Sequence, residues 1–269
     1  MLGAGTNKAC LKLAHLEDGR AVPGLIDGPN GLPLLRIHGP YAAPTQHFCE
    51  YNEVMVCASG IGVTPLASAL KSIAHFRWRF SLDRAFPDSA TFIWVVAHKE
   101  IPSFRWLVRT IKEAEDAVLN LQSKASKENN NRRIKFRIFI TSHSKTETER
   151  YLRLKEEERN AEDAGLWGMP YASNDTVSKL SVNFTEQQLY DALMSPKEGT
   201  QTFGNVLITL GRPKWDEIFG AVQDTTAEKD VGVTFCGNPL IGSDIKNACL
   251  KFSHKDNGKI KWHLHKEVF

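Results

Sequence analysis

The segment EVMVCASGIGVTP, residues 53–65, decides the predicted fold. Its first seven residues form a short apolar run, which indicates a buried strand. Gly60 and Gly62 follow at once, and two glycines so placed let the backbone turn tightly and approach a ligand closely. Residues 65–77 then have helical composition, and Thr64 is placed to cap this helix, which begins with a proline. The segment therefore predicts a strand, a glycine turn and a helix in direct succession.

Similar units follow toward the C-terminus. The pattern predicts further strands in five apolar or alternating runs: residues 91–97, 134–140, 206–210, 231–236 and 259–265. It predicts further helices in four segments with apolar residues at helical spacing: 104–121, 184–194, 213–222 and 241–252. Strands separated by helices of this length imply right-handed crossovers and a parallel sheet. The predicted fold class is therefore α/β, a parallel sheet flanked by helices.

Composition narrows the possible functions of the 269 residues. The formal net charge is +3 and 24% of the residues are charged, which argues against a nucleic-acid binder and against general disorder. The five cysteines include no Cys-x-x-Cys pair and fit a reducing compartment. The nine histidines show no ligand spacing, so no metal site is predicted.

Two segments depart from the regular alternation. Residues 1–52 are rich in Gly and Pro and have too few apolar runs to close a barrel. Residues 143–163 carry 12 charged side chains out of 21, which indicates a solvated helix or a mobile insertion, or else a docking site for a partner. We therefore expect a short N-terminal part, 1–52, and a main domain, 53–269, with a charged insertion near 143–165.

Ligands of parallel sheets bind at the carboxyl ends of the strands, so the loops there hold the candidate site. The first loop comprises Gly60, Ile61, Gly62, Val63, Thr64 and Pro65. Its glycines and the N-terminus of the following helix suit a pyrophosphate, although a plain tight turn would have the same local sequence.

Two further loops add candidate residues. Gly211 and Arg212 follow the run 206–210, where a guanidinium can bind a phosphate with two hydrogen bonds; the alternative is a surface arginine in a turn. Cys236 and Gly237 end the run 231–236. The Cys236 thiol either borders the reaction centre or is an inert small apolar group, and nothing nearby indicates a histidine-activated nucleophile.

Five strings together resemble one family. They are His38–Tyr41, Gly60–Pro65, Gly211–Trp215, Cys236–Pro239 and the ending Lys266–Phe269. In order and spacing they resemble the C-terminal dehydrogenase region of the superoxide-generating NADPH oxidases and dual oxidases, within the ferric reductase-like superfamily. The resemblance covers roughly residues 36–269. It implies a ferredoxin-reductase-like NADPH-binding domain at 53–269, preceded in 1–52 by the C-terminal part of an FAD-binding β-barrel.

The resemblance also implies a function. NADPH would pass hydride to FAD, and electrons would continue through membrane haems to oxygen, producing superoxide or hydrogen peroxide. Gly60, Gly62 and Thr64 would bind the pyrophosphate and Arg212 the 2′-phosphate. Cys236 would flank the nicotinamide and Phe269 would cover the flavin ring, so these two are the expected catalytic residues.

The chain departs from the family at three places. Ala58 stands where the family's first loop usually begins with another glycine. Where the family has a second phosphate-binding arginine, this sequence has Ala97-His98-Lys99-Glu100, so His98 or Lys99 is expected to take that role. The family's flavin motif and haem-bearing helices are absent, so the FAD site is expected to be incomplete and haem to lie only in a missing membrane part.

We therefore expect a fragment, soluble alone, of a larger enzyme on the cytoplasmic side of a membrane. Its expected partners are the missing barrel and haem domain, and a regulatory protein at the charged insertion. Two alternatives stay open. One is the dehydrogenase domain of a ferric-chelate reductase, and the other is a catalytically silent nucleotide-binding or regulatory module.

Overall fold

The computed structural model describes residues 26–27, 33–35, 44–78, 87–124, 132–163, 184–254 and 260–267. The chain forms two compact units, Met1–Ala42 and Ala43–Phe269. In the first unit, β1 (Ile26–Asp27) pairs antiparallel with β2 (Pro33–Leu35). Apart from these two strands, the expected barrel segment before residue 44, which includes the string 38–41, lies outside the described residues.

The second unit contains a seven-stranded sheet in the order β6-β7-β5-β4-β3-β8-β9. The strands are β3 (Glu53–Ser59), β4 (Ser89–Ala97), β5 (Arg133–Thr141), β6 (Thr200–Phe203), β7 (Val206–Leu210), β8 (Asp230–Cys236) and β9 (Lys261–Glu267). All neighbouring strands are parallel except β6 and β7, which form an antiparallel pair at one edge. The predicted parallel α/β sheet is thus confirmed.

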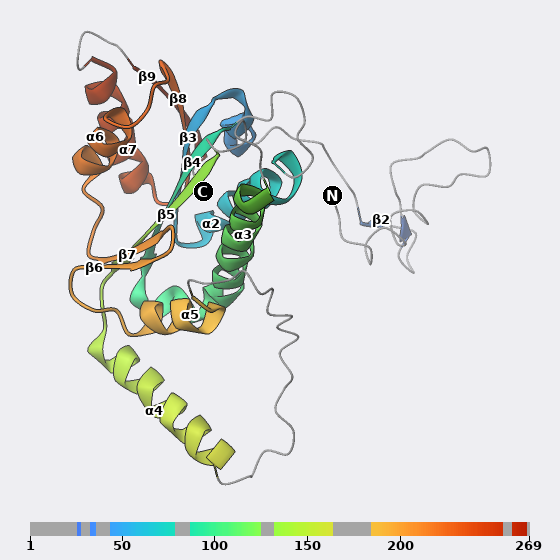
Figure 1. Ribbon diagram of the computed structural model, residues 1–269, viewed down its shortest axis with the longest axis vertical. Helices are drawn as coiled ribbons and strands as arrows, with labels where there is room; N and C mark the ends of the chain where they lie inside the picture. Colours follow the sequence, from blue (N-terminus) through green and yellow to red (C-terminus); the bar gives the residue numbers. More distant parts are fainter. Residues whose placement is uncertain are drawn as a thin grey trace. The chain divides into compact units, whose positions relative to one another are not determined.

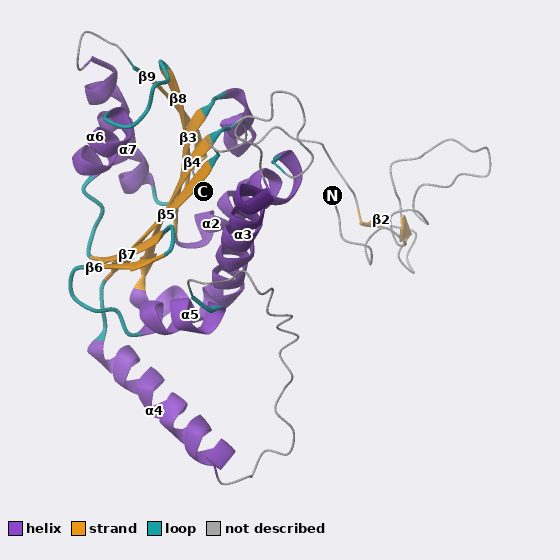
Figure 2. Ribbon diagram, in the orientation of Figure 1, coloured by secondary structure: helices purple, strands orange, loops and turns teal. Residues whose placement is uncertain are grey.

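Helices cover both faces of this sheet. They are the short turns η1 (Pro44–Glu50), η2 (Gly60–Gly62), η3 (Ser72–Arg77) and η4 (His98–Phe104), and the helices α2 (Val63–Lys71), α3 (Arg105–Lys124), α4 (Lys145–Asp163), α5 (Glu186–Met194), α6 (Trp215–Gln223) and α7 (Pro239–His254). Figures 1 and 2 show α2, α3 and α5 on one side of the sheet and α6 and α7 on the other.

Alternating side chains of the strands divide the core between these two faces. Val54 and Val56 of β3 pack in the cluster that includes residues of α2, α3 and α5. Met55 and Cys57 point the other way, into the cluster with α6 and α7. Because successive strand residues face opposite sides, a strand covered on both faces is apolar throughout, which is why 53–59 has no polar alternation.

The predicted starts of α2 and α6 are each wrong by two residues. Helix α2 begins at Val63 with Gly62 as its N-cap, and the Thr64 hydroxyl donates to the Ile61 carbonyl at 3.1 Å instead of capping. The proline after Thr64 is tolerated because the first turn of a helix needs no amide hydrogens. Helix α6 begins at Trp215, and its N-cap Lys214 is extended, so Pro213 precedes the helix.

The edge strand β6 was not predicted from the sequence. It is only four residues long and half exposed, too short for a periodic signal. The turn that joins it to β7 depends on a distant residue, because the Asn205 amide donates to Glu115 Oε1 of α3 at 2.9 Å.

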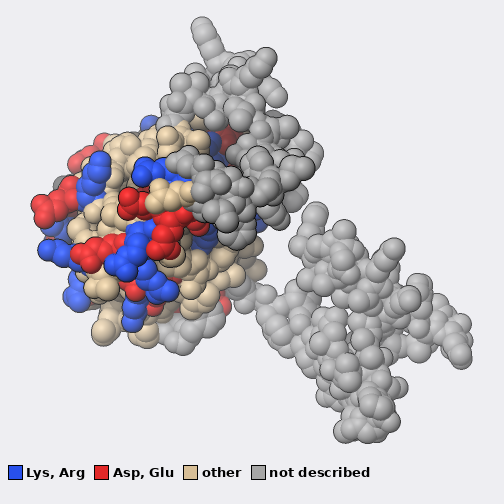
Figure 3. Space-filling model, turned by 90° about the horizontal axis from the view of Figure 1, so that it is seen from below, with Lys and Arg blue, Asp and Glu red and all other residues tan. Residues whose placement is uncertain are grey.

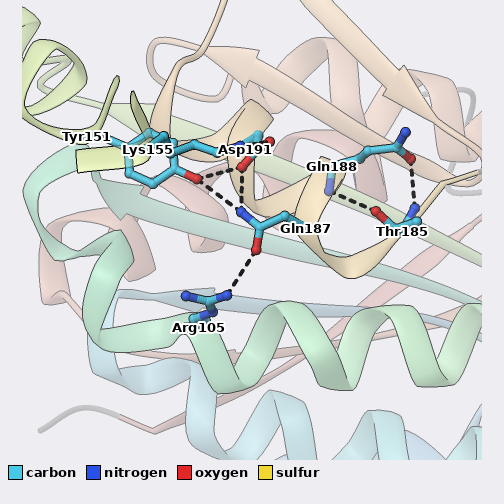
Figure 4. A network of polar contacts seen from close by, with 7 residues as sticks. All are labelled: Arg105, Tyr151, Lys155, Thr185, Gln187, Gln188 and Asp191. Carbon is cyan, nitrogen blue, oxygen red and sulfur yellow. Dashed lines mark hydrogen bonds and ion pairs between the residues drawn. The ribbon is translucent and has the colours of Figure 1, made fainter. Parts of the chain in front are cut away.

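The charged segment forms helix α4. Of the predicted alternatives, the solvated helix is the one that the structure contains. Tyr151 and Lys155 of α4 donate hydrogen bonds to the Asp191 carboxylate of α5, at 2.5 and 2.6 Å, and Gln187 joins the same network (Figure 4). Acidic and basic side chains are interspersed on the face seen in Figure 3, in keeping with the small net charge. Among the described helices, none combines the length and the apolar composition that crossing a membrane requires.

Candidate functional site

The strand order reverses between β3 and β8. From β3 the chain proceeds through β4 and β5 to β7 on one side, and then returns through α6 to β8 on the other side of β3. Ser59 ends β3 and Cys236 ends β8, side by side at the carboxyl edge. In open parallel sheets such a switch point forms the ligand crevice.

The loops after β3 and β8 are pressed together at this point. A Cβ atom on Gly62 would lie 2.2 Å from the Cys236 carbonyl oxygen, and one on Gly237 would lie 2.2 Å from Ser59 Oγ. The Asn238 amide donates to Ser59 Oγ at 2.7 Å. Ser59 and Asn238 were not predicted as site residues, because only the adjacency of β3 and β8 brings them together.

Two helices begin at the same edge, but their first turns differ. The Asn238 side chain accepts a hydrogen bond from the Leu240 amide at 2.9 Å and so caps α7. The N-cap of α2 is Gly62, which has no side chain to accept from the amides of the first turn. The Val63 amide already donates to the Gly60 and Ile61 carbonyls and Pro65 has no amide hydrogen, so an anion at this end of α2 would be bound by the amides that remain there. The neighbouring Ile61 and Thr64 are exposed, whereas Val63 is buried and Pro65 half-buried.

Cys236 lies beside the last strand, opposite Glu267 in the parallel register. The thiol is buried, and burial together with the Glu267 charge raises its pKa to about 11. The thiol is therefore protonated at neutral pH, which agrees with a packing or contact role rather than a nucleophilic one. Oxygen Oε2 of Glu267 is buried without a hydrogen-bond partner among the described residues. Glu267 was not among the predicted site residues, although it belongs to the C-terminal string.

His98 and Lys99 follow β4 but have different surroundings. The Ser144 amide donates to His98 Nδ1 at 3.3 Å, and Nε2 lies 3.0 Å from the Met194 carbonyl. Both ring nitrogens of this fully buried side chain are thus engaged within the protein, and burial lowers its pKa. His98 has no nitrogen left for a ligand, whereas Lys99 is exposed.

Arg212 follows β7 and is exposed. Gly211 before it has a φ of 119°, a conformation that favours glycine, and its amide donates to the Ile140 carbonyl at 2.8 Å. Within the described part of the chain, Arg212 has no ion-pair or hydrogen-bond partner, so its guanidinium is available. Phe269 lies outside the described residues.

Comparison with known proteins identifies the family of the chain. A family model described as the ferric reductase NAD binding domain matches residues 51–250. A superoxide-generating NADPH oxidase heavy chain of Dictyostelium discoideum is 28% identical over 246 residues, 91% of this chain and 37% of that protein. Respiratory burst oxidase homolog protein B of Oryza sativa subsp. japonica is 25% identical over 264 residues, 91% of this chain and 24% of that protein.

A human relative shows the same relation. NADPH oxidase 3 of Homo sapiens is 23% identical over 269 residues, 99% of this chain and 38% of that protein. The chain thus spans between about a quarter and two-fifths of the length of these three relatives. Since the family model covers most of the chain and the sheet has the expected parallel order, the chain belongs to the family of ferric reductase NAD-binding domains and is similar to NADPH oxidases over most of its length.

Proposed function

We propose that the chain binds NADPH along the carboxyl edge of its sheet and presents the nicotinamide for hydride transfer to a flavin. The observation that carries this proposal is the order of the chemical groups along that edge. Arg212 follows β7, Lys99 follows β4, the glycine turn follows β3, Cys236 ends β8 and Glu267 ends β9.

The spacing of the strands gives approximate distances between these groups. With neighbouring strands about 4.8 Å apart, β7 and β3 are separated by roughly 14 Å, and β8 lies about 5 Å beyond β3. An extended dinucleotide can therefore place its 2′-phosphate near Arg212, its pyrophosphate at the glycine turn and its nicotinamide near Cys236.

The glycine turn fits a pyrophosphate chemically. Gly60 has a φ of 52° and brings the backbone close to the crevice without a side chain. The N-terminus of α2 supplies amide hydrogens and a partial positive charge. Ile61, Val63, Thr64 and Pro65 continue this loop into the helix, and we assign the whole loop 60–65 to the pyrophosphate.

Arg212 and Lys99 are assigned to the 2′-phosphate. A charge-assisted hydrogen bond contributes about 1.5–3 kcal/mol, which corresponds to a preference of roughly 10- to 100-fold for NADPH over NADH. The Arg212 guanidinium offers a bidentate contact and Lys99 a single ammonium, so Arg212 is assigned the larger share.

The opposite end of the crevice positions the nicotinamide. When bound, NADPH supplies the hydride that the flavin accepts. Gly237 allows the β8 loop to approach Ser59, and the protonated Cys236 thiol forms an uncharged wall beside the ring. Phe269 is proposed to cover the flavin ring until the nicotinamide displaces it. The protein's contribution is orientation, since the cofactors carry the hydride chemistry.

The similarity to superoxide-generating oxidases supports a place in a larger membrane enzyme. We propose that FAD is bound mainly by further parts of that enzyme, that membrane haems pass the electrons to oxygen, and that this domain lies on the cytoplasmic side. The family model's description supports a second candidate, in which ferric iron is the acceptor.

Titration calorimetry of the purified chain with NADPH and with NADH tests the nucleotide assignment. We expect NADPH to bind 10- to 100-fold more tightly, and Arg212→Ala to remove most of this difference, leaving the smaller share assigned to Lys99. Lys214→Ala is the matched control, because Lys214 lies in the same loop but pairs with Glu217 at 2.9 Å. Equal affinities in the unaltered chain, or a preference that is undiminished in Arg212→Ala, would refute the assignment.

A further inference from the structure

Three potential metal ligands meet where the segment before β3 packs against the last strand. His47 Nδ1 and Glu50 Oε1 of η1 lie 2.7 Å apart. The imidazole rings of His47 and His265 stack with their centroids 4.1 Å apart. One ligand atom from each of His47, Glu50 and His265 lies within 4.8 Å of the other two. No sequence pattern indicated this group, since His47 precedes the first strand of the sheet and His265 lies in the last one.

The fold explains why these side chains converge. Residues three apart eclipse each other on a 3₁₀ turn, which brings His47 and Glu50 of η1 to one side. Tyr51 fixes the turn against the sheet, because its ring fills the space where a Cβ on Gly232 would lie, 2.3 Å from the ring. The Tyr51 ring also stacks on His263 of β9, with centroids 5.3 Å apart.

From this geometry we propose that His47, Glu50 and His265 form a Zn²⁺ site that ties η1 to β9. Two imidazoles and one carboxylate are a known donor set for zinc, with water in the fourth position. Calcium and magnesium prefer oxygen ligands and fit this set poorly. The site is independent of the nucleotide crevice, since it uses none of the residues assigned there.

Seating the ion requires the side chains to turn, because the His47 and His265 rings are stacked within 16° of parallel and their nitrogens do not point to a common centre. Two donors that lie about 2.1 Å from a tetrahedral zinc ion are about 3.4 Å apart, so donor atoms at the present limit of 4.8 Å must approach each other by about 1.4 Å. His47 and Glu50 are 34% and 53% exposed, which leaves the ion a path from solvent and room for the side chains to turn.

An outer partner for one ligand is already in place. The Tyr51 hydroxyl lies 3.0 Å from Nε2 of His265, so it orients the ring and leaves the other nitrogen for the ion. Metal-binding histidines almost always have such a partner on the second nitrogen. Zinc bound here links η1 to the strand that ends at Glu267, two residues beyond His265.

Zinc binding is measured on the metal-free chain without a polyhistidine tag, by competition with a chromophoric chelator and Zn²⁺ as the only probe. We expect one ion per chain with a Kd in the micromolar range or below. His47→Asn and His265→Asn are each expected to weaken binding by at least tenfold, and Glu50→Gln by a smaller factor. Calcium and magnesium are expected to leave the zinc affinity unchanged.

Two variants serve as controls. His254→Asn removes an exposed histidine of α7 and should bind zinc like the unaltered chain. Cys49→Ser removes a half-exposed thiol next to the cluster and should also bind normally, with no thiolate charge-transfer band when Co²⁺ replaces zinc.

Circular dichroism confirms that each variant is folded; if His265→Asn is not, His47→Asn on the more exposed turn decides. Absence of stoichiometric zinc, or loss of binding in Cys49→Ser or His254→Asn rather than in the cluster variants, would overturn the proposal.

Discussion

Gly62 lies so close to Cys236 that a Cβ atom on it would stand 2.2 Å from the Cys236 carbonyl oxygen and 2.6 Å from the carbonyl carbon. Both of these atoms are backbone, so no side chain can swing away to make room. The two loops at the switch point are therefore held at a separation that only glycine permits.

Gly62→Ala is expected to force these loops apart. Overpacking of this kind costs about 1–3 kcal/mol in the free energy of unfolding, and the distorted crevice should bind NADPH at least tenfold more weakly. Urea unfolding and calorimetry measure the two effects. Gly220→Ala is the control, because the nearest atom to its Cβ is 4.0 Å away and alanine favours the helix by about 1 kcal/mol. Unchanged stability in Gly62→Ala would show that the loops can separate freely.

Cys236 and Glu267 provide a test of the electrostatics at the other end of the crevice. Burial and the Glu267 charge raise the pKa of the Cys236 thiol to about 11, so at pH 8 the thiolate fraction is small and alkylation slow. Glu267→Gln removes the charge but leaves the burial, which should lower the pKa in part and speed alkylation of Cys236 by about two- to tenfold. Mass spectrometry of iodoacetamide-treated protein measures the rate. The same rate in both proteins would mean that Glu267 does not act on this thiol.

Most strands of the sheet could be predicted from the pattern of apolar residues in the sequence. Residues 134–140 alternate, and 53–59 and 231–236 are short apolar runs before glycine turns; all three are strands. Such segments are predictable because one or both faces are buried, so local pattern and tertiary packing agree.

What the sequence missed depends on contacts between distant segments. Ser59 enters the site through the Asn238 amide, and His98 is removed from it through Ser144 and Met194. In each case the partner is fixed by strand order and by loop packing, which the one-dimensional pattern does not contain. Of the two candidates that follow β4, His98 or Lys99, only Lys99 is exposed.

Glu115 predicts a pH dependence of stability. Burial raises the pKa of this carboxyl, although the Asn205 amide and Lys112 act in the opposite direction. A carboxyl whose pKa is higher in the folded than in the unfolded protein destabilises the fold as pH rises through its ordinary value of 4.5. Glu115→Gln keeps an acceptor for the Asn205 amide and removes this ionisation.

The free energy of unfolding of Glu115→Gln, measured relative to the unaltered protein, is expected to increase as pH rises from about 4 to 7. Urea unfolding at several pH values measures it. Glu115→Ala is the companion variant: it leaves the Asn205 amide without its partner and should cost about 1–3 kcal/mol at every pH. A constant difference between Glu115→Gln and the unaltered protein would contradict the raised pKa.

Asp191 of α5 accepts hydrogen bonds from α4 (Figure 4). We therefore expect its charge to control whether α4 stays docked on α5. Burial alone would raise its pKa, but hydrogen bonds from Lys155, Tyr151 and Gln187 outweigh it and bring the pKa below the ordinary 3.8. A lowered pKa stabilises the docked form above pH 3.8, and this stabilisation is lost as pH falls through the folded-state value. Asp191→Asn removes the charge at every pH and should free α4 at neutral pH.

Limited proteolysis at pH 7 measures this release, because α4 is exposed along most of its length and is protected mainly by its docking. Cleavage within 145–163 is expected to become several-fold faster in Asp191→Asn, while the urea midpoint of the sheet domain stays nearly unchanged, since Asp191 itself is only half-buried and belongs to neither core cluster. Glu156→Gln is the control, because this α4 side chain is 67% exposed and lies 3.9 Å from Arg159 on the same helix. If cleavage is equally fast in all three proteins, Asp191 does not hold α4. The regulatory protein that the sequence led us to expect at the charged segment would then have to bind a helix without a fixed position.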